Sequence, residues 1–400
     1  MEKIFNIGYT FSKKYDIIKT VWAFFARENA IFVYFILEGV IMSHLSQFQA
    51  VLKQKGFDAA IVSQKTNQRY LSEFDFDDGL VLVTVRQSYL ITDFRYVEAA
   101  KAQVTSEMTV LTPSGGQLLC IAGLLSDNGC KRVAIEEQAL SCADFERYTS
   151  VLKDFEVLSG ASALLMELRL LKDERELDTI ARAQAITDAA FAHIVNLIKP
   201  DMTDIEVALE LEFFMRRNGA ETVAFDTIAV SGTNSSHPHG VPRRTKLERG
   251  FLTMDFGAKV DGYCSDMTRT VVLGKATEEE KKLYHTVLSA QLAALDAACE
   301  GASCKELDAV ARNIIDGAGY KGMFGHSLGH GVGMFIHENP RLSFAAKPES
   351  VLERGHVVTV EPGIYVEGKH GCRIEDMIAV CHDGSIRNFT KSPKEMIELF

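Results

Sequence analysis

Residues 251–270 are FLTMDFGAKVDGYCSDMTRT, and this stretch decides the fold of the part of the chain that carries the chemistry. The apolar run 251–254 predicts a strand that ends at Asp255, where an ionised carboxylate is costly to bury unless something positive meets it. The DGY at 261–263 is typical of a hairpin turn. Because Asp266 follows Asp255 by 11 residues (266 − 255), the hairpin can bring both carboxylates to one point. Taken alone, this pair is better explained as a polar strand end and a turn residue.

Three positions further along the chain carry side chains of the same kind. His330 lies between glycines in GHGVG, and these glycines allow the backbone to be approached closely. Glu361 ends a strand-like run in VEPG, and Glu375 follows it by 14 residues (375 − 361) inside CRIED. Each of the three alone is weak evidence for a site.

Together the five positions make a stronger case than any one of them. Two Asp, one His and two Glu form a hard, oxygen-rich set that suits two divalent ions about 3.5–4 Å apart. Divalent ions also explain how four acids converge without mutual repulsion raising their pKa values. No Cys belongs to the set, which disfavours a structural zinc site. The predicted metal ligands are Asp255, Asp266, His330, Glu361 and Glu375.

The chain around this set falls into two parts. Short apolar runs alternate with helical patterns up to residue 158 and predict an α/β N-terminal domain with a mixed sheet. A boundary is expected near 160–171, followed by a long helix over 173–198. Later helices are grouped apart from strand-like runs, which predicts an α+β C-terminal domain. The predicted strands are 59–63, 79–85, 88–92, 132–136, 156–158, 224–230, 251–256, 269–273, 357–360 and 373–380; capping boxes are expected at Thr203 with Glu206, Thr277 with Glu280 and Ser303 with Glu306.

Residues 1–41 are predicted to be an upstream extension that is not part of the fold, with Met42 as the natural start. The apolar run 30–37 is flanked by Glu28 and Glu38 and is shorter than the roughly 18 residues that a membrane span needs. No small-residue cleavage site follows the run. A targeting or membrane-surface segment is the less favoured interpretation.

Five blocks of the sequence resemble the signature of the Xaa-Pro aminopeptidase and prolidase group of the pita-bread metallopeptidases. They are MDFG (254–257), SDMTRT (265–270), HSLGHGVG (326–333), VEPGIY (360–365) and RIED (373–376). The resemblance extends from about Leu171 to the C-terminus, and the part from about Met42 resembles a creatinase-type N-terminal domain. It implies domains over 42–165 and 171–400, the second with the pita-bread (creatinase/aminopeptidase) fold.

The resemblance also implies a role for each matching position. Asp255 is expected to be a terminal, bidentate ligand of one metal, and Asp266 and Glu375 are expected to bridge both metals. His330 and Glu361 are expected to complete the second metal. Glu361 is also the expected proton shuttle between the attacking water and the leaving proline nitrogen.

Residues outside the metal set match the family as well. His239 resembles the residue that stabilises the tetrahedral intermediate, and His337 resembles the one that contacts the scissile carbonyl. His326 and Arg373 resemble residues of the pocket that receives proline. Asp376 is expected to be a second acid behind the ligands or a surface residue.

The activity that the resemblance implies is hydrolysis of the bond between an N-terminal residue and proline by an Xaa-Pro aminopeptidase. A strict Xaa-Pro dipeptidase (prolidase) is the alternative, and a non-catalytic binding module with the same fold is a more remote one. Methionine aminopeptidase is disfavoured by the separate first domain, and creatinase by the intact ligand set. The expected cofactors are two divalent ions per chain, Mn2+ with Co2+ or Zn2+ as alternatives, and the expected partners are short peptides with proline second and a second copy of the chain.

The bulk properties of the chain exclude other classes of partner. The formal net charge is −11 and no basic stripe is present, so nucleic acid is not expected to bind. No membrane association is expected. The 8 Cys are scattered and form no C-x-x-C pair, which fits a reducing cytoplasm.

Overall fold

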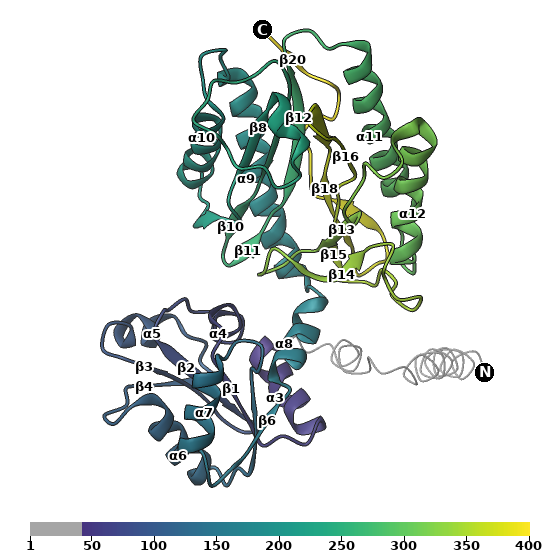
Figure 1. The fold of residues 1–400 in the computed structure, drawn as a ribbon. Coiled ribbons are helices and arrows are strands. Elements are labelled where there is room, and N and C mark those ends of the chain that lie inside the picture. The colour runs from purple at the N-terminus through teal and green to yellow at the C-terminus, as the bar shows by residue number, and fades with distance from the viewer. Residues whose placement is uncertain (1–41) are drawn as a thin grey trace, which may run out of the picture. The chain divides into compact units, whose positions relative to one another are not determined.

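The structure is a computed structural model that describes residues 42–400. The predicted extension over 1–41 lies outside the described residues. The chain divides between Leu164 and Leu165 into two compact units, each described here by itself (Figure 1). The domain limits predicted from the sequence, 42–165 and 171–400, stay a proposal beside this division. Within the described part of the chain, none of the helices combines the length and the apolar character that a membrane crossing requires.

One mixed sheet forms the centre of the first unit and confirms the predicted fold class. Its strands run in the order β4-β3-β2-β1-β5-β6, with β1–β2 and β2–β3 antiparallel and the remaining neighbours parallel. The strands are β1 (Ala59–Val62), β2 (Gly79–Thr84), β3 (Ser88–Thr92), β4 (Met108–Leu111), β5 (Arg132–Ile135) and β6 (Glu156–Ser159); the helices are α3 (His44–Gln54), α4 (Lys65–Ser72), α5 (Val97–Gln103), α6 (Gln117–Asp127) and α7 (Cys142–Val151). The sequence patterns did not predict α4, β4 or α7.

The helices of the second unit include α9 (Glu174–Leu197), α10 (Asp204–Arg217), α11 (Glu278–Ala297) and α12 (Cys304–Ile315), while α8 (Ala161–Leu170) crosses the boundary between the units. The capping signals predicted from the sequence mark the starts of α10, α11 and α12. Reciprocal capping boxes form at Thr203 and Thr277 as predicted. At Ser303 only the first half forms: its hydroxyl accepts from the Glu306 N–H.

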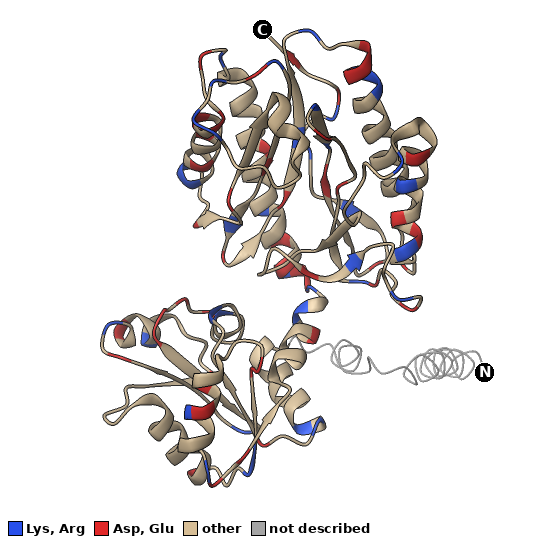
Figure 2. Cartoon of the chain, in the orientation of Figure 1, with Lys and Arg blue, Asp and Glu red and all other residues tan. Residues whose placement is uncertain are grey.

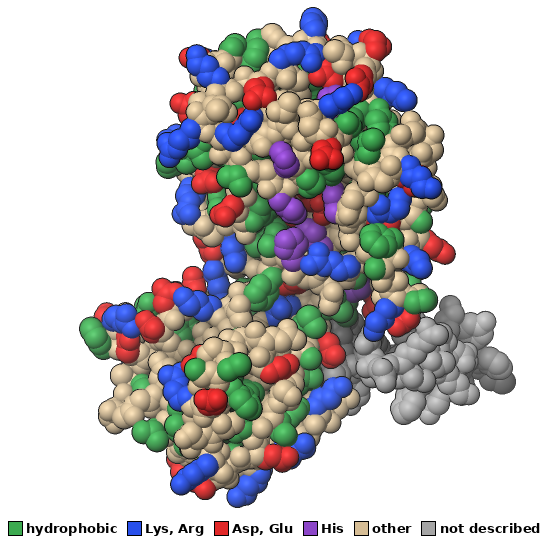
Figure 3. All heavy atoms as spheres, viewed as in Figure 1, with side chains coloured by type: hydrophobic (Ala, Val, Ile, Leu, Met, Phe, Trp, Pro, Cys, Tyr) green, Lys and Arg blue, Asp and Glu red, His purple; other side chains and the backbone are tan. Residues whose placement is uncertain are grey.

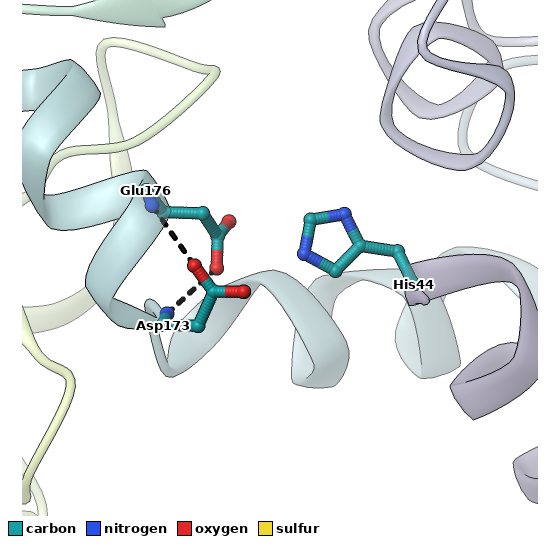
Figure 4. A group of neighbouring side chains, drawn as sticks. All are labelled: His44, Asp173 and Glu176. Carbon is teal, nitrogen blue, oxygen red and sulfur yellow. Dashed lines mark hydrogen bonds between the residues drawn. The ribbon is translucent and has the colours of Figure 1, made fainter. Parts of the chain in front are cut away.

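Helix α9 has a further capping box, drawn in Figure 4. The Asp173 carboxylate accepts from the Glu176 N–H at 2.9 Å, and the Glu176 carboxylate accepts from the Asp173 N–H at 2.8 Å. Two backbone N–H groups at the start of this long helix thereby gain hydrogen-bond acceptors. The start of the second unit's first complete helix is therefore well defined.

The strands of the second unit lie between two pairs of helices. Figure 1 shows α9 and α10 on one side of the strands and α11 and α12 on the other. The sheets have the orders β11-β10-β7, β20-β12-β9-β8, β14-β13-β15-β18-β19 and β16-β17. The strands are β7 (Thr222–Val223), β8 (Ile228–Ser231), β9 (Gly250–Phe256), β10 (Ala258–Val260), β11 (Tyr263–Cys264), β12 (Met267–Leu273), β13 (Gly329–Gly331), β14 (Glu338–Leu342), β15 (Val357–Val360), β16 (Gly363–Val366), β17 (His370–Arg373), β18 (Asp376–Val380), β19 (Ile386–Asn388) and β20 (Glu398–Leu399).

Alternation along β9 separates an apolar core from a polar face. Leu252, Met254 and Phe256 pack into the core beneath α9 and α10. Because successive side chains of a strand point to opposite faces, Thr253 and Asp255 lie on the other face. A second apolar core lies against α11 and α12 and takes in Phe251.

One predicted strand proved to be two. The run 373–380 is divided between β17, which ends at Arg373, and β18, which begins at Asp376. The two strands belong to different sheets, because β17 pairs with β16 and β18 pairs with β15. Glu375 therefore lies at the break between the two strands.

Candidate metal centre

The five predicted ligands come from strand ends of the second unit. Asp255 lies in β9, Asp266 immediately precedes β12, and His330 is the middle residue of β13. Glu361 directly follows β15, and Glu375 directly precedes β18. Figure 2 shows acidic positions on the strands in the middle of this unit as well as on its outer helices.

The predicted hairpin between Asp255 and Asp266 is present. Asp261 and Gly262 turn the chain with φ values of 47° and 85°, the positive range that a tight hairpin turn requires. In the register of β9 with β12, Thr268 pairs with Asp255. Asp266 is two residues before Thr268, so it lies on the same face of the sheet as Asp255.

Close approach of backbones explains the two glycines beside His330. A Cβ at Gly329 would lie 1.9 Å from the Thr359 carbonyl oxygen, and one at Gly331 would lie 2.0 Å from the Asn339 carbonyl oxygen. Only glycine fits at these two positions. The glycines thus let β13 pack tightly between its neighbours and fix where the imidazole lies.

Ligand atoms from several elements converge on the imidazole. His330 Nε2 lies 3.5 Å from Asp266 Oδ2 and 3.4 Å from Glu361 Oε1. Asp266, His330 and Glu375 each offer one ligand atom, and these three atoms lie within 4.8 Å of one another. The structure therefore brings four of the five predicted ligands to one place.

The hydrogen bonds of His330 define its tautomer. Nδ1 lies 3.0 Å from the Gly331 carbonyl oxygen, which only accepts, so the hydrogen of the neutral ring is on Nδ1. Nε2 then directs a lone pair toward Asp266 and Glu361. Burial lowers the pKa of His330 to about 3 and keeps the ring neutral. This is the state in which imidazole binds a metal.

The buried acids of the site lie close together, and nearby positive charges do not fully offset their negative charge. Burial, and after it the charges of Glu375 and Asp255, raises the pKa of Asp266 well above its ordinary value. Burial raises the pKa of Glu361 to about 8. Burial and the neighbouring carboxylates likewise raise the pKa of Glu375. Divalent cations would remove this conflict because their charge stabilises the ionised carboxylates.

The hydrogen bonds of Asp255 indicate whether the residues of the site fit a metal ion. Its Oδ2 accepts from Arg373 Nη2 at 2.6 Å, whereas its Oδ1 is buried and has no hydrogen-bond partner among the described residues. A buried carboxylate oxygen without a partner is costly. The orphaned oxygen, the hard donor set and the tautomer of His330 all fit divalent ions bound at this place.

Arg373 links the acids to a tyrosine and a histidine. Its guanidinium also donates to Thr268 Oγ1 at 2.9 Å and to the Tyr365 hydroxyl at 2.6 Å. The Tyr365 hydroxyl lies 3.0 Å from His326 Nε2. The predicted part of Arg373 in a proline pocket stays a prediction; the structure adds that Arg373 holds Asp255, which the sequence did not indicate.

The predicted substrate-facing histidines surround the acids. The His337 ring lies 4.4 Å from the His330 ring, edge to face. Burial and then the charge of Arg373 lower the pKa of His326 to about 4, and His239 adds to this effect and to the lowered pKa of His337. His239 and His337 are exposed. Figure 3 shows histidine side chains gathered on one face of the second unit.

Asp376 is not a surface residue, contrary to one of the two expectations for it. It is fully buried, and its carboxylate accepts from Arg269 Nη2 at 2.8 Å and from Lys394 Nζ at 2.7 Å. A buried carboxylate needs such partners. Asp376 therefore fixes the start of β18, next to Glu375.

Arg341 is a further residue of the site that sequence reasoning missed. It lies on β14, is exposed, and has no hydrogen bond or ion pair among the described residues. Its positive charge adds to the effect of burial in lowering the pKa values of His330 and His337, and it opposes the larger effect of burial on the pKa of Glu361. Its position four residues after His337 was the available signal.

Buried carboxylates and one imidazole at strand ends, with exposed histidines around them, define the class of this protein as a metal-dependent hydrolase. Comparison with known proteins gives the family. The model described as metallopeptidase family M24 matches residues 178–382, and the one described as the Creatinase/Prolidase N-terminal domain matches residues 44–171. The chain belongs to metallopeptidase family M24. It is therefore a peptidase that uses divalent metal ions.

This chain aligns with similar proteins over nearly the whole length of those proteins. It is 40% identical to an uncharacterized peptidase, YqhT, of Bacillus subtilis, over 89% of this chain and 99% of that protein. The solved Xaa-Pro dipeptidase from Bacillus anthracis is 39% identical, with a TM-score of 0.84 over 89% of this chain and 99% of that one. The solved X-Pro aminopeptidase from Thermotoga maritima is 37% identical, with a TM-score of 0.81 over 86% and 98%. The predicted family and fold class are confirmed.

Proposed function

We propose that this chain hydrolyses the peptide bond between an N-terminal residue and proline. The observation that supports this most strongly is the buried ligand cluster of Asp266, His330 and Glu375, with the orphaned oxygen of Asp255 beside it. The solved relatives named above as Xaa-Pro dipeptidase and X-Pro aminopeptidase support the choice of substrate.

We propose Asp255, Asp266, His330, Glu361 and Glu375 as the ligands. Two divalent ions held there would lower the pKa of water and so supply hydroxide near neutral pH. Mn2+ is the proposed metal, with Co2+ or Zn2+ as alternatives, because carboxylate-rich sites suit harder cations and the single imidazole suits any of the three.

The protein's own groups then have distinct tasks. Glu361 receives the proton of the attacking water and delivers it to the leaving proline nitrogen, a task that suits a carboxylate that lies 3.4 Å from His330 Nε2 among the proposed ligands. His239 and His337 are exposed beside the acids, where they meet the developing negative charge on the carbonyl oxygen. His326, held by Tyr365, lies at the side where the proline ring is received.

The proposal leaves a choice between a strict dipeptidase and an aminopeptidase. Arg341 favours the dipeptidase. A dipeptide ending in proline carries a carboxylate next to the ring, whereas a longer peptide carries a neutral carbonyl there. A guanidinium without a partner beside His337 and Glu361 is suited to bind that carboxylate in a charge-assisted pair.

The test is hydrolysis of Ala-Pro, Ala-Pro-Ala and Ala-Ala by protein stripped with chelator and restored with Mn2+. Cleavage of both proline peptides with Ala-Ala untouched supports an aminopeptidase, and cleavage of Ala-Pro alone supports a dipeptidase. No cleavage of any peptide under any metal would contradict the proposal.

The part of Arg341 is tested by Arg341→Gln. Loss of a charge-assisted pair raises the KM for Ala-Pro about tenfold or more, with a smaller change for Ala-Pro-Ala. Arg387→Gln is the matched control, because Arg387 lies on β19 at the opposite edge of the same sheet. Equal changes in KM for both peptides would show that Arg341 does not select for the carboxylate.

A further inference from the structure

Glu338, the residue after His337, has a buried carboxylate that the metal centre does not use. Its side chain is 5% exposed. Oε2 accepts from Lys172 Nζ at 2.8 Å, and Oε1 accepts from Arg169 Nε at 3.4 Å and from the Phe335 N–H at 3.2 Å. Lys172 and Glu338 are 166 residues apart in the chain.

These contacts fasten the short segment 332–337 that joins β13 to β14. The Phe335 N–H is bound by Glu338, and the Arg169 guanidinium lies 4.7 Å from the centre of the Phe335 ring. The Phe335 carbonyl oxygen accepts from the Gly333 N–H at 3.1 Å. The segment is therefore held at Phe335 and at Glu338, on both sides of His337.

His337 has no other anchor of its own. Among the described residues its side chain makes no hydrogen bond, and its one recorded ring contact is with His330, at 4.4 Å. The position of an exposed ring of this kind is determined by its backbone. The first half of the segment is held separately, because the Cys264 N–H donates to the Gly333 carbonyl oxygen at 2.8 Å and Lys259 Nζ donates to the Met334 carbonyl oxygen at 3.3 Å. The contacts of Phe335 and Glu338 are the ones that hold the half that carries His337.

The charges of its two partners explain why Glu338 contributes most to holding this segment. Arg169 and Lys172 are both buried, and both form an ion pair with Glu338. Burial alone would raise the pKa of Glu338, but Lys172 and Arg169 hold it below its ordinary value. Without Glu338, two buried cations would face each other, which is strongly unfavourable.

We propose that Glu338 is a positioning residue that holds His337 over the metal centre through the segment 332–337. The inference rests on the proposed peptidase function, since the measured quantity is turnover of Ala-Pro. Among the described residues, the Glu338 carboxylate forms no hydrogen bond or ion pair with a proposed ligand, and it acts through the backbone of the segment that carries His337.

A double-mutant cycle tests this. Glu338→Gln keeps the shape of the side chain but loses one acceptor, so Lys172 competes with Phe335 and Arg169 for the remaining oxygen. We expect kcat/KM for Ala-Pro to fall about 10- to 100-fold, as is usual when the support of a metal-site residue is removed. In the His337→Ala background the same change is expected to lower kcat/KM little further, because the ring that Glu338 holds is absent.

The matched control is Glu280→Gln. Glu280 is also a buried Glu that binds an Arg and a backbone N–H, those of Arg249 and Thr277, but it lies in α11. If Glu338→Gln leaves kcat/KM unchanged, or lowers it by the same factor with and without His337, the inference is wrong. If the wild-type protein does not cleave Ala-Pro, the proposed function itself fails and the inference falls with it.

A second variant covers the case in which Glu338→Gln does not fold. Arg169→Gln loosens Phe335 but leaves Lys172 and Glu338 as a neutral buried pair. The same cycle with His337→Ala is expected to show a loss of kcat/KM that depends on His337. A loss that is independent of His337 would overturn the inference. Metal content measured on each variant should stay that of the wild type, because no proposed ligand is changed.

Discussion

Glu361 combines three properties at the scale of single residues. It lies 3.4 Å from His330 Nε2, it accepts from Thr359 Oγ1 at 3.2 Å, and burial raises its pKa to about 8. A carboxylate has two oxygens, so one of them can bind a metal ion while the other accepts and returns a proton. This supports its proposed place in proton transfer as well as in metal binding.

Glu361→Gln tests that double task. General acid–base catalysis contributes about 10²–10⁴-fold, so kcat for Ala-Pro is expected to fall by at least that factor. Glu353→Gln is the matched control, since Glu353 is also a partly buried acid of the second unit whose pKa burial raises. A Glu361→Gln protein that keeps kcat within about twofold of the wild type would contradict the assignment.

His356 predicts how stability depends on pH. Its Nδ1 accepts from the Glu353 N–H at 2.9 Å, and burial, with a smaller effect of Lys172, lowers its pKa to about 3. A His whose folded pKa is depressed gives up stability as pH falls from its unfolded value near 6.5 toward 3. At pH 4 this loss reaches about 3 kcal/mol.

The measurement is urea unfolding of the wild type and His356→Gln at pH 7 and pH 4. The wild type is expected to lose up to about 3 kcal/mol more stability than the variant over this interval. His285→Gln, which changes an exposed histidine, provides the control. Parallel losses in wild type and His356→Gln would show that His356 is not responsible.

Sequence patterns predicted the candidate ligands but not the residues that hold the site in place. Asp255, Asp266, His330, Glu361 and Glu375 were found because each lies in a short motif, and the structure brings at least four of them together. Glu338 was missed because its role depends on partners far along the chain, and Arg341 was missed because an exposed arginine on a strand belongs to no local motif. No local pattern predicts that Lys172 will meet a carboxylate 166 residues away.

At the scale of elements, apolar runs and long stretches with clear limits were predicted, and short polar elements were missed. The strand β3 was predicted as a short buried run, and α9 was predicted as a long helix that ends before Pro200. Helix α4, KTNQRYLS, was missed because only Tyr70 and Leu71 are large and apolar. The break at Glu375 was missed because no Gly or Pro in 373–380 marks the point where the chain passes from one sheet to another.

The two kinds of helix start give an element-scale prediction. Thr277 exchanges hydrogen bonds with Glu280 in both directions, whereas Ser303 only accepts from the Glu306 N–H at 3.4 Å. Thr277→Ala is expected to lower the free energy of unfolding by about 1 kcal/mol. Ser303→Ala, its matched control, is expected to have a clearly smaller effect. An equal or larger loss for Ser303→Ala in urea unfolding would contradict this account of the caps.

At the scale of the whole molecule, the second unit is built so that two apolar cores leave a polar face between them. The cores lie against α9 with α10 and against α11 with α12. The sequence predicted an α+β fold from grouped helices and strands, and family resemblance predicted the pita-bread arrangement. Patterns of residues alone could not give the strand orders, because pairing of distant strands depends on tertiary packing.

We infer that the acids and the imidazole between these cores bind divalent ions. The measurement to make is the number of Mn2+ ions per chain after dialysis, by elemental analysis, for the wild type, Asp255→Asn and the control Asp204→Asn, which changes a buried Asp of α10 that binds Arg243. We expect about two ions for the wild type, fewer for Asp255→Asn, and the wild-type number for a folded Asp204→Asn. A wild type that retains no divalent ion of any kind, or an Asp255→Asn protein that retains as many as the wild type, would contradict it.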